Sequence, residues 1–92
     1  MNKKVMEWWH SHRVGANPYA KFVLMFLAMD ADKTGRGTTS RRRLARDTNL
    51  PDREIIDHLI DLEKLKLIQA DLDERGRIDY QLNLKKKGAR TK

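Results

Sequence analysis

The chain has 92 residues, which allow one domain with one modest hydrophobic core and exclude a two-domain protein. Its composition, 39% hydrophobic and 36% charged, indicates a folded domain with a polar surface rather than a disordered chain. There is no cysteine, which excludes disulfides and thiolate metal sites, and the net charge of +7 favours a polyanionic partner.

The charge is unevenly distributed along the chain. Residues 1–51 carry a net +6, residues 52–79 a net −4, and residues 80–92 a net +5. No apolar run approaches the roughly 18 residues that a membrane span requires, and the first residues do not lead into a secretory signal. We therefore expect a cytoplasmic, nucleoid-associated protein with no membrane partner.

The first predicted element is a helix over residues 3–13, within an N-terminal helical extension of residues 1–16. Val5, Trp8 and Trp9 make its apolar side. Two adjacent tryptophans require burial, because each contributes on the order of 2 to 3 kcal/mol when it leaves water. They either complete the domain's own core or join two copies, and we assign Val5, Trp8 and Trp9 to a homodimer interface.

A long helix is predicted next, beginning at Asn17-Pro18 and continuing to about Asp32. Asn can cap free backbone N–H groups, and Pro is tolerated at the first helical position. Apolar residues recur from Tyr19 to Met29 at helical spacing and over a wide arc, so this helix is expected to be central and buried on most sides. Residues 33–37, with two glycines, are expected to break the pattern.

Two shorter helices follow in the sequence. Ser40 is placed to cap a helix over residues 41–47, Asn49 can adopt the left-handed conformation of a tight corner, and a third helix runs from residue 51 or 52 to residue 64. Arg41, Arg42 and Arg43 open the second helix, where cations oppose the helix dipole. Their presence there favours a role in binding over a role in stability.

The C-terminal part of the chain predicts a β-hairpin and a tail. Residues 67–72 and 77–84 flank a turn at residues 73–76, and the second arm alternates Ile78, Tyr80, Leu82 and Leu84. This pattern indicates a hairpin with one buried face. The basic tail, residues 85–92, is expected to be disordered when free.

The order helix, extended linker, helix, turn, helix and hairpin resembles the winged helix-turn-helix domains of phage and plasmid replication initiators and related small bacterial regulators. The resemblance covers about 60% of the chain and is carried by residues 22–29, 35–37, 40, 44–45, 49–50 and 55–68. Lys66 occupies the position of the family's usual glycine after the third helix, so the turn into the wing must be made without glycine. The implied fold is α+β and mainly α: a three-helix core with a C-terminal β-hairpin wing over residues 17–84, preceded by the extra N-terminal helix.

The resemblance implies sequence-specific binding of double-stranded DNA by a transcriptional regulator or a replication accessory factor. Arginines of the second helix and the basic tail are expected to contact phosphate, Arg53 and Asn49 to read bases, and Arg75 and Arg77 to enter a flanking groove. The full set of expected DNA-binding residues is Ser40, Arg41, Arg42, Arg43, Arg46, Asn49, Arg53, Arg75, Arg77, Lys85, Lys86 and Lys87.

The third helix supports an alternative. Four carboxylates on its outward face would repel phosphate. That face is expected to carry Asp52, Arg53, Glu54, Asp57, His58 and Asp61. In this alternative the domain is a protein-protein interaction module whose acidic third helix docks a basic partner.

Catalysis is not expected from this sequence. It has no nucleophile motif and no glycine-rich phosphate loop. His10, His12 and His58 have no metal-ligand spacing, and a chain of this length has little room for a substrate cleft. We therefore expect no enzyme activity, no cofactor and no metal.

Overall fold

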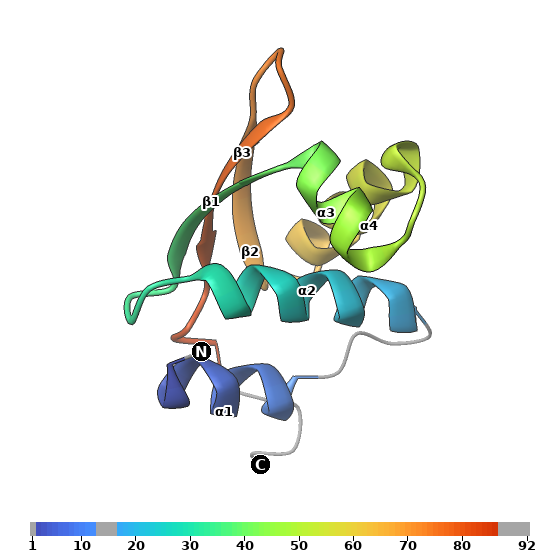
Figure 1. The fold of residues 1–92 in the computed structure, drawn as a ribbon. Coiled ribbons are helices and arrows are strands. Elements are labelled where there is room, and N and C mark those ends of the chain that lie inside the picture. The colour runs from blue at the N-terminus through green and yellow to red at the C-terminus, as the bar shows by residue number, and fades with distance from the viewer. Residues whose placement is uncertain (1, 13–16, 87–92) are drawn as a thin grey trace.

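The computed structural model describes residues 2–12 and 17–86 (Figure 1). Within these residues the protein is α+β and mainly helical, with four helices and one three-stranded antiparallel sheet, a layout compatible with the expected winged helix. The elements are α1 (Lys3–Ser11), α2 (Pro18–Asp30), β1 (Arg36–Ser40), α3 (Arg41–Thr48), α4 (Asp52–Lys64), β2 (Ile68–Leu72) and β3 (Arg77–Leu82). No helix in the described segments has both the length and the apolar character that crossing a membrane requires.

The sheet has the strand order β1-β3-β2 and includes a strand that the sequence did not predict. Residues 33–37 were expected only to interrupt the helical pattern, but β1 begins at Arg36 and pairs with β3, with Gly37 opposite Tyr80. Pairing with a strand some forty residues away extends this segment, which has little apolar alternation of its own. The expected hairpin of β2 and β3 is confirmed, with β3 ending at Leu82 rather than at residue 84.

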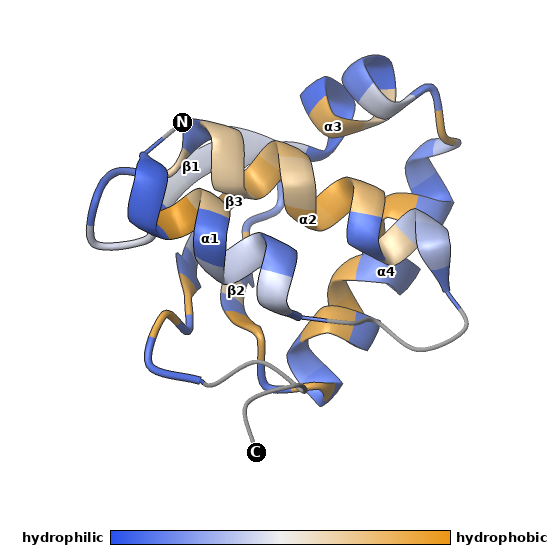
Figure 2. Ribbon diagram, turned by 90° about the horizontal axis from the view of Figure 1, so that it is seen from below, coloured by the Kyte–Doolittle hydropathy of each residue, from blue (hydrophilic) through white to orange (hydrophobic). Residues whose placement is uncertain are grey.

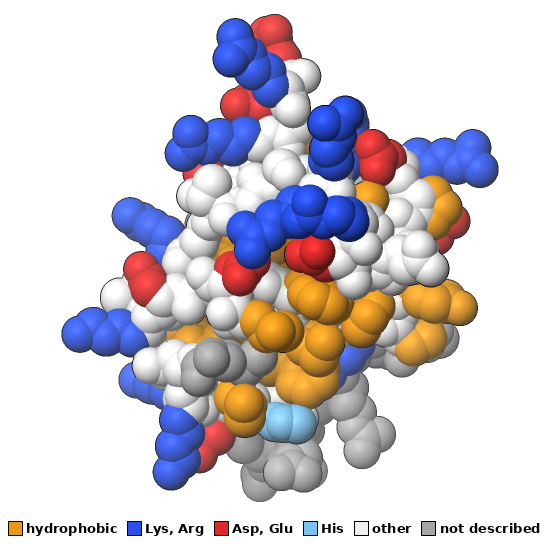
Figure 3. Space-filling view, in the orientation of Figure 1, with side chains coloured by type: hydrophobic (Ala, Val, Ile, Leu, Met, Phe, Trp, Pro, Cys, Tyr) orange, Lys and Arg blue, Asp and Glu red, His pale blue; other side chains and the backbone are white. Residues whose placement is uncertain are grey.

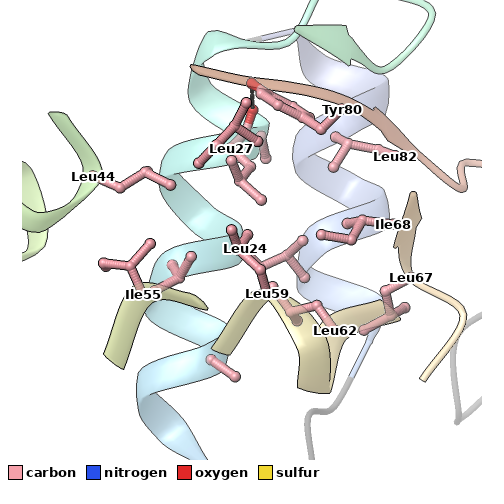
Figure 4. Packing of buried hydrophobic residues seen from close by; sticks show 14 of the residues in the cluster. Leu24, Leu27, Leu44, Ile55, Leu59, Leu62, Leu67, Ile68, Tyr80 and Leu82 are labelled. Carbon is pink, nitrogen blue, oxygen red and sulfur yellow. Dashed lines mark hydrogen bonds between the residues drawn. The ribbon is translucent and has the colours of Figure 1, made fainter. Parts of the chain in front are cut away.

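Helix α2 is the centre of the hydrophobic core, as predicted (Figure 4). Its N-terminus is capped by Asn17, whose side-chain oxygen accepts a hydrogen bond from the backbone N–H of Ala20 at 3.2 Å. The prediction that α2 is buried on most sides is wrong for one side, because Tyr19, Phe22 and Met29 are exposed. No other described element covers that side of the helix.

The corner between α3 and α4 has the predicted local structure. Ser40 Oγ accepts a hydrogen bond from the backbone N–H of Arg43 at 3.0 Å, and Asn49 has a left-handed backbone with φ of 60°. After α4, Lys66 adopts φ of 64°, so a lysine makes the turn that usually requires glycine. The expected outward position of His58 is wrong, because its ring is buried.

Helix α1 belongs to the same core as the rest of the domain. Val5 and Trp8 are buried within the chain, and Trp9 packs beside them. Figure 2 shows α1 lying alongside α2. Lys21 of α2 fastens the C-terminal end of α1: its ammonium group donates to the carbonyl oxygens of Trp9 and His12 and lies 4.4 Å from the centre of the Trp9 ring. Burial of Val5 and Trp8 in one chain removes them from any surface that a second copy can reach.

Candidate nucleic-acid interface

The N-terminus of α3 and the tip of the β2–β3 hairpin meet on one side of α2. The backbone N–H of Arg41 donates to the carbonyl oxygen of Gly76 at 2.8 Å, which joins the hairpin turn to the first turn of α3. A shallow hollow of about 360 Å³ lies at this junction. Its lining residues are Ser40, Arg41, Arg42, Asp52, Arg75 and Gly76.

The hairpin tip is held in place by a single aspartate. The Asp73 carboxylate accepts hydrogen bonds from the backbone N–H groups of Arg75 and Arg77, each at 2.9 Å, and Gly76 has φ of 87°, which favours glycine. The sequence analysis assigned a role to the arginines of this turn but none to Asp73. Aspartate favours turns because its side chain can accept hydrogen bonds from the nearby backbone, so its residue type was a usable signal.

Lys and Arg side chains gather over α3 and the hairpin in Figure 3, and they differ in how they are paired. Arg42, Arg53 and Arg75 are exposed, and within the described residues their guanidinium groups have no carboxylate oxygen within 4.0 Å. Arg42 and Arg75 line the same hollow from two different elements. Two unpaired guanidinium groups at the N-terminus of a helix form an environment that favours an anion.

The other arginines of α3 are already paired with carboxylates. Arg43 lies 3.4 Å from Asp30 and 3.7 Å from Asp47, and Arg46 lies 3.5 Å from Asp47. These pairs are partly exposed, so each contributes little to stability, but each lowers the charge that its arginine can offer to phosphate. The structure therefore divides the four arginines of α3, which the sequence treated as one group.

Several of the expected DNA-binding residues do not line the hollow, and three of them, Arg77, Lys85 and Lys86, lie on other parts of the domain. Arg77 is 3.3 Å from Asp79 on the outer face of the sheet. Lys85 and Lys86 follow β3 beside α1, where His12 Nε2 donates to the carbonyl oxygen of Lys86 at 3.0 Å, so α2 separates them from α3 and the hairpin tip (Figure 1). Lys87 is outside the described residues.

The two expected base-reading residues flank the corner between the helices. Asn49 is exposed in the turn after α3, and Arg53 is exposed in the first turn of α4. Neither lines the hollow, so they would contact a ligand separately from Arg42 and Arg75.

The acidic residues of α4 differ in their partners and in their exposure, whereas their spacing predicted one uniform acidic face. Asp52 lies 4.0 Å from Arg41, and Asp61 accepts a hydrogen bond from the side-chain amide of Asn17 at 3.0 Å. Glu54 is half-buried beside the ring of His58, with its oxygen 3.9 Å from Nε2. Asp57 is exposed, and its carboxylate has no hydrogen-bond or ion-pair partner among the described residues.

Among residues 2–12 and 17–86, no group of three or more His, Asp or Glu side chains is placed to hold a metal ion. No protein-family model matches the sequence, and no curated protein is significantly similar to it. The functional assignment therefore depends on the chemistry of the surface around α3, α4 and the hairpin.

Proposed function

We propose that this protein binds double-stranded DNA as a winged helix-turn-helix domain, acting in the nucleoid as a transcriptional regulator or a replication accessory factor. The observation that carries the proposal is the hollow in which Arg42 of α3 and Arg75 of the hairpin tip face a common space without carboxylate partners. The strand order β1-β3-β2, with α3 and α4 packed against α2, supports the same assignment.

The hollow suits a phosphate group of the DNA backbone. The first turn of α3 contains no acidic residue, so the positive end of its dipole is not offset from within the helix. Asp52 forms part of the lining, and Arg41 offsets its charge at 4.0 Å. A phosphate seated here would be held from two elements at once, which fixes the orientation of the domain on the duplex.

Helix α4 is then the element that enters the major groove. Arg53 lies at its N-terminal end, where a guanidinium group can make a bidentate contact to guanine. Asp57, one turn later, can accept a hydrogen bond from the amino group of cytosine. Asp52 lies 4.0 Å from Arg41, and Glu54 and Asp61 are half-buried, so the exposed Asp57 is the carboxylate of α4 expected to repel phosphate most strongly.

Fluorescence anisotropy with a labelled DNA duplex at several salt concentrations tests the proposal. We expect Arg42→Ala and Arg75→Ala each to raise Kd roughly tenfold at low salt, since each removes a charge-assisted contact. The double variant should reduce the slope of log K against log salt by about 1, because the two arginines hold one phosphate and each neutralised phosphate contributes roughly 0.9.

Arg36→Ala is the matched control. Arg36 is also exposed, and its guanidinium group has no carboxylate oxygen within 4.0 Å in the described chain, but it lies at the end of β1 remote from the hairpin tip. Unchanged binding in the Arg42 and Arg75 variants, or an equal loss in Arg36→Ala, would refute the assignment of the hollow. Circular dichroism of each variant checks that the fold is retained.

The alternative function, capture of a basic protein by α4, has one observation in its favour. Ile60 is 43% exposed on α4 and Ile56 beside it is half-buried, so the outer face of α4 carries apolar surface in addition to Asp57. The Asp57→Asn variant separates the two functions. It should strengthen non-specific DNA binding if α4 enters the groove, whereas it should leave DNA binding unchanged if α4 docks a protein.

A further inference from the structure

Helix α2 carries an exposed apolar stripe that the core does not use. Tyr19 is 56% exposed, Phe22 37% and Met29 47%, and the half-buried Met25 and Phe26 lie between them. The rings of Phe22 and Phe26 meet edge to face, with centroids 5.2 Å apart. Figure 3 shows hydrophobic side chains gathered over α2, below the charged side chains of α3 and the hairpin.

We propose that this α2 stripe packs against the α2 stripe of a second copy of the chain, with the two helices antiparallel about a twofold axis. Tyr19, Phe22 and Met29 together leave on the order of 300 Å² of apolar surface in water, which is comparable to the largest apolar patch on a typical monomer, and such patches are often functional. This area is below the roughly 800 Å² per partner of a standard interface, so the dimer is weak, with Kd on the order of 10 to 100 µM.

The charges of α2 favour the antiparallel arrangement. The first turn of α2 contains no acidic residue and its last turn no basic residue, so neither end of the helix dipole is offset by side chains of α2. Asp30 stands at the C-terminal end, next to the stripe. In an antiparallel pair, the negative helix end of one copy lies beside the positive helix end of the other, while Asp30 adds little charge there because it lies 3.4 Å from Arg43 of its own chain.

The order of side chains along the stripe is also complementary to itself when reversed. The aromatic rings of Tyr19 and Phe22 lie toward the N-terminal end and the thioether of Met29 lies at the C-terminal end. Antiparallel packing places Met29 of each copy over aromatic rings of its partner, a favourable sulfur–aromatic contact. Parallel packing would place rings on rings at one end and sulfur on sulfur at the other.

This dimer also arranges the DNA-binding surfaces, a consequence that rests on the proposed function. The hairpin tip and α3 lie on one side of α2 and α1 lies on the other (Figure 1), while hydrophobic side chains over α2 face a third direction, toward the viewer in Figure 3. A twofold axis in the plane of the stripes and perpendicular to α2 turns both hollows toward the same side. The dimer would then present two equivalent surfaces to the two halves of a palindromic site.

Analytical ultracentrifugation of the whole chain from 1 to 200 µM, without DNA, tests the dimer. We expect the wild type to dimerise across this range and Phe22→Glu to raise the dissociation constant at least tenfold, because a charge would be buried at the centre of the stripe. Leu72→Glu is the control, since Leu72 is 43% exposed on β2, away from α2. A wild type that is monomeric at 200 µM overturns the proposal, as does an equal loss in both variants.

Disulfide trapping tests the antiparallel register. Because the chain contains no cysteine, any disulfide must involve the introduced residues. Positions 19 and 29 lie about 15 Å apart along α2, beyond the roughly 7 Å limit of Cα separation for a disulfide. A mixture of Tyr19→Cys and Met29→Cys proteins should therefore form a mixed disulfide dimer, while each variant alone should not.

Self-linking of either variant, without a mixed product, would overturn the antiparallel arrangement. The two experiments use no DNA, so failure of the dimer is distinguishable from failure of the proposed function. Conversely, loss of DNA binding in Arg42→Ala leaves the dimer unaffected, because Arg42 is not part of the α2 stripe.

Discussion

Replacing Gly37 with alanine tests the contact that holds β1 in the fold. A methyl group at this position would lie 2.5 Å from Cζ of Tyr80 and 3.1 Å from its Cε1, far inside van der Waals contact. The Tyr80 ring is buried and its hydroxyl donates to the carbonyl oxygen of Leu27 at 2.6 Å (Figure 4). Burial raises the pKa of Tyr80, so the hydroxyl stays neutral and remains the donor.

The clash cannot be relieved without loss elsewhere. Moving the ring costs about 1 to 3 kcal/mol for overpacking, and breaking its buried hydrogen bond costs about 1 to 3 kcal/mol more. We expect Gly37→Ala to lower the free energy of unfolding by about 3 kcal/mol, which for a domain of this size lowers Tm by roughly 15 °C.

Urea denaturation followed by tryptophan fluorescence and circular dichroism measures this change. Tyr80→Phe provides the second arm of a double-mutant cycle. It removes the hydroxyl, so the two substitutions should cost less together than the sum of their separate costs. If Gly37→Ala lies within about 0.5 kcal/mol of the wild type, β1 does not pack against Tyr80 as described, and the reasoning fails.

Two further predictions concern stability. Lys66→Gly should stabilise the protein by about 0.5 to 1 kcal/mol, because glycine adopts the φ of 64° without the strain that a lysine bears. Lys64→Gly, in α4, should destabilise it by about 1 kcal/mol. A lower urea midpoint in Lys66→Gly than in the wild type would contradict the backbone assignment. Burial lowers the pKa of His12 below its usual 6.5, so the unfolded chain binds a proton more readily than the folded one, and stability should fall as pH falls below 6.5. Urea midpoints at pH 7.5 and 5.5 should therefore differ more in the wild type than in His12→Asn, and equal differences in the two proteins would count against this role of His12.

Signals close together in the sequence determined most of the secondary structure. The caps at Asn17 and Ser40 and the left-handed corner at Asn49 are local interactions, each between residues no more than three apart, so the residue types alone indicate them. The buried face of β3 is equally local, because alternation of side chains follows from the geometry of one strand. For the same reason the hairpin and the boundaries of α3 and α4 were predictable.

Interactions between distant residues decided the rest. β1 exists because it pairs with β3. Gly37 is required by the ring of Tyr80, 43 positions further along the chain. Without these distant partners in view, the two glycines of residues 33–37 suggested only a loop. The same holds for part of the charge pattern: Asp30 reaches Arg43, and the hairpin tip reaches Arg41, only after folding. The pairs of Asp47 with Arg43 and Arg46 are local to α3 and follow from its helical spacing. Trp8 is buried, and one side of α2 is exposed, because of where α1 packs in the folded domain. That position is determined by the apolar area that all the elements bury together and not by any local pattern.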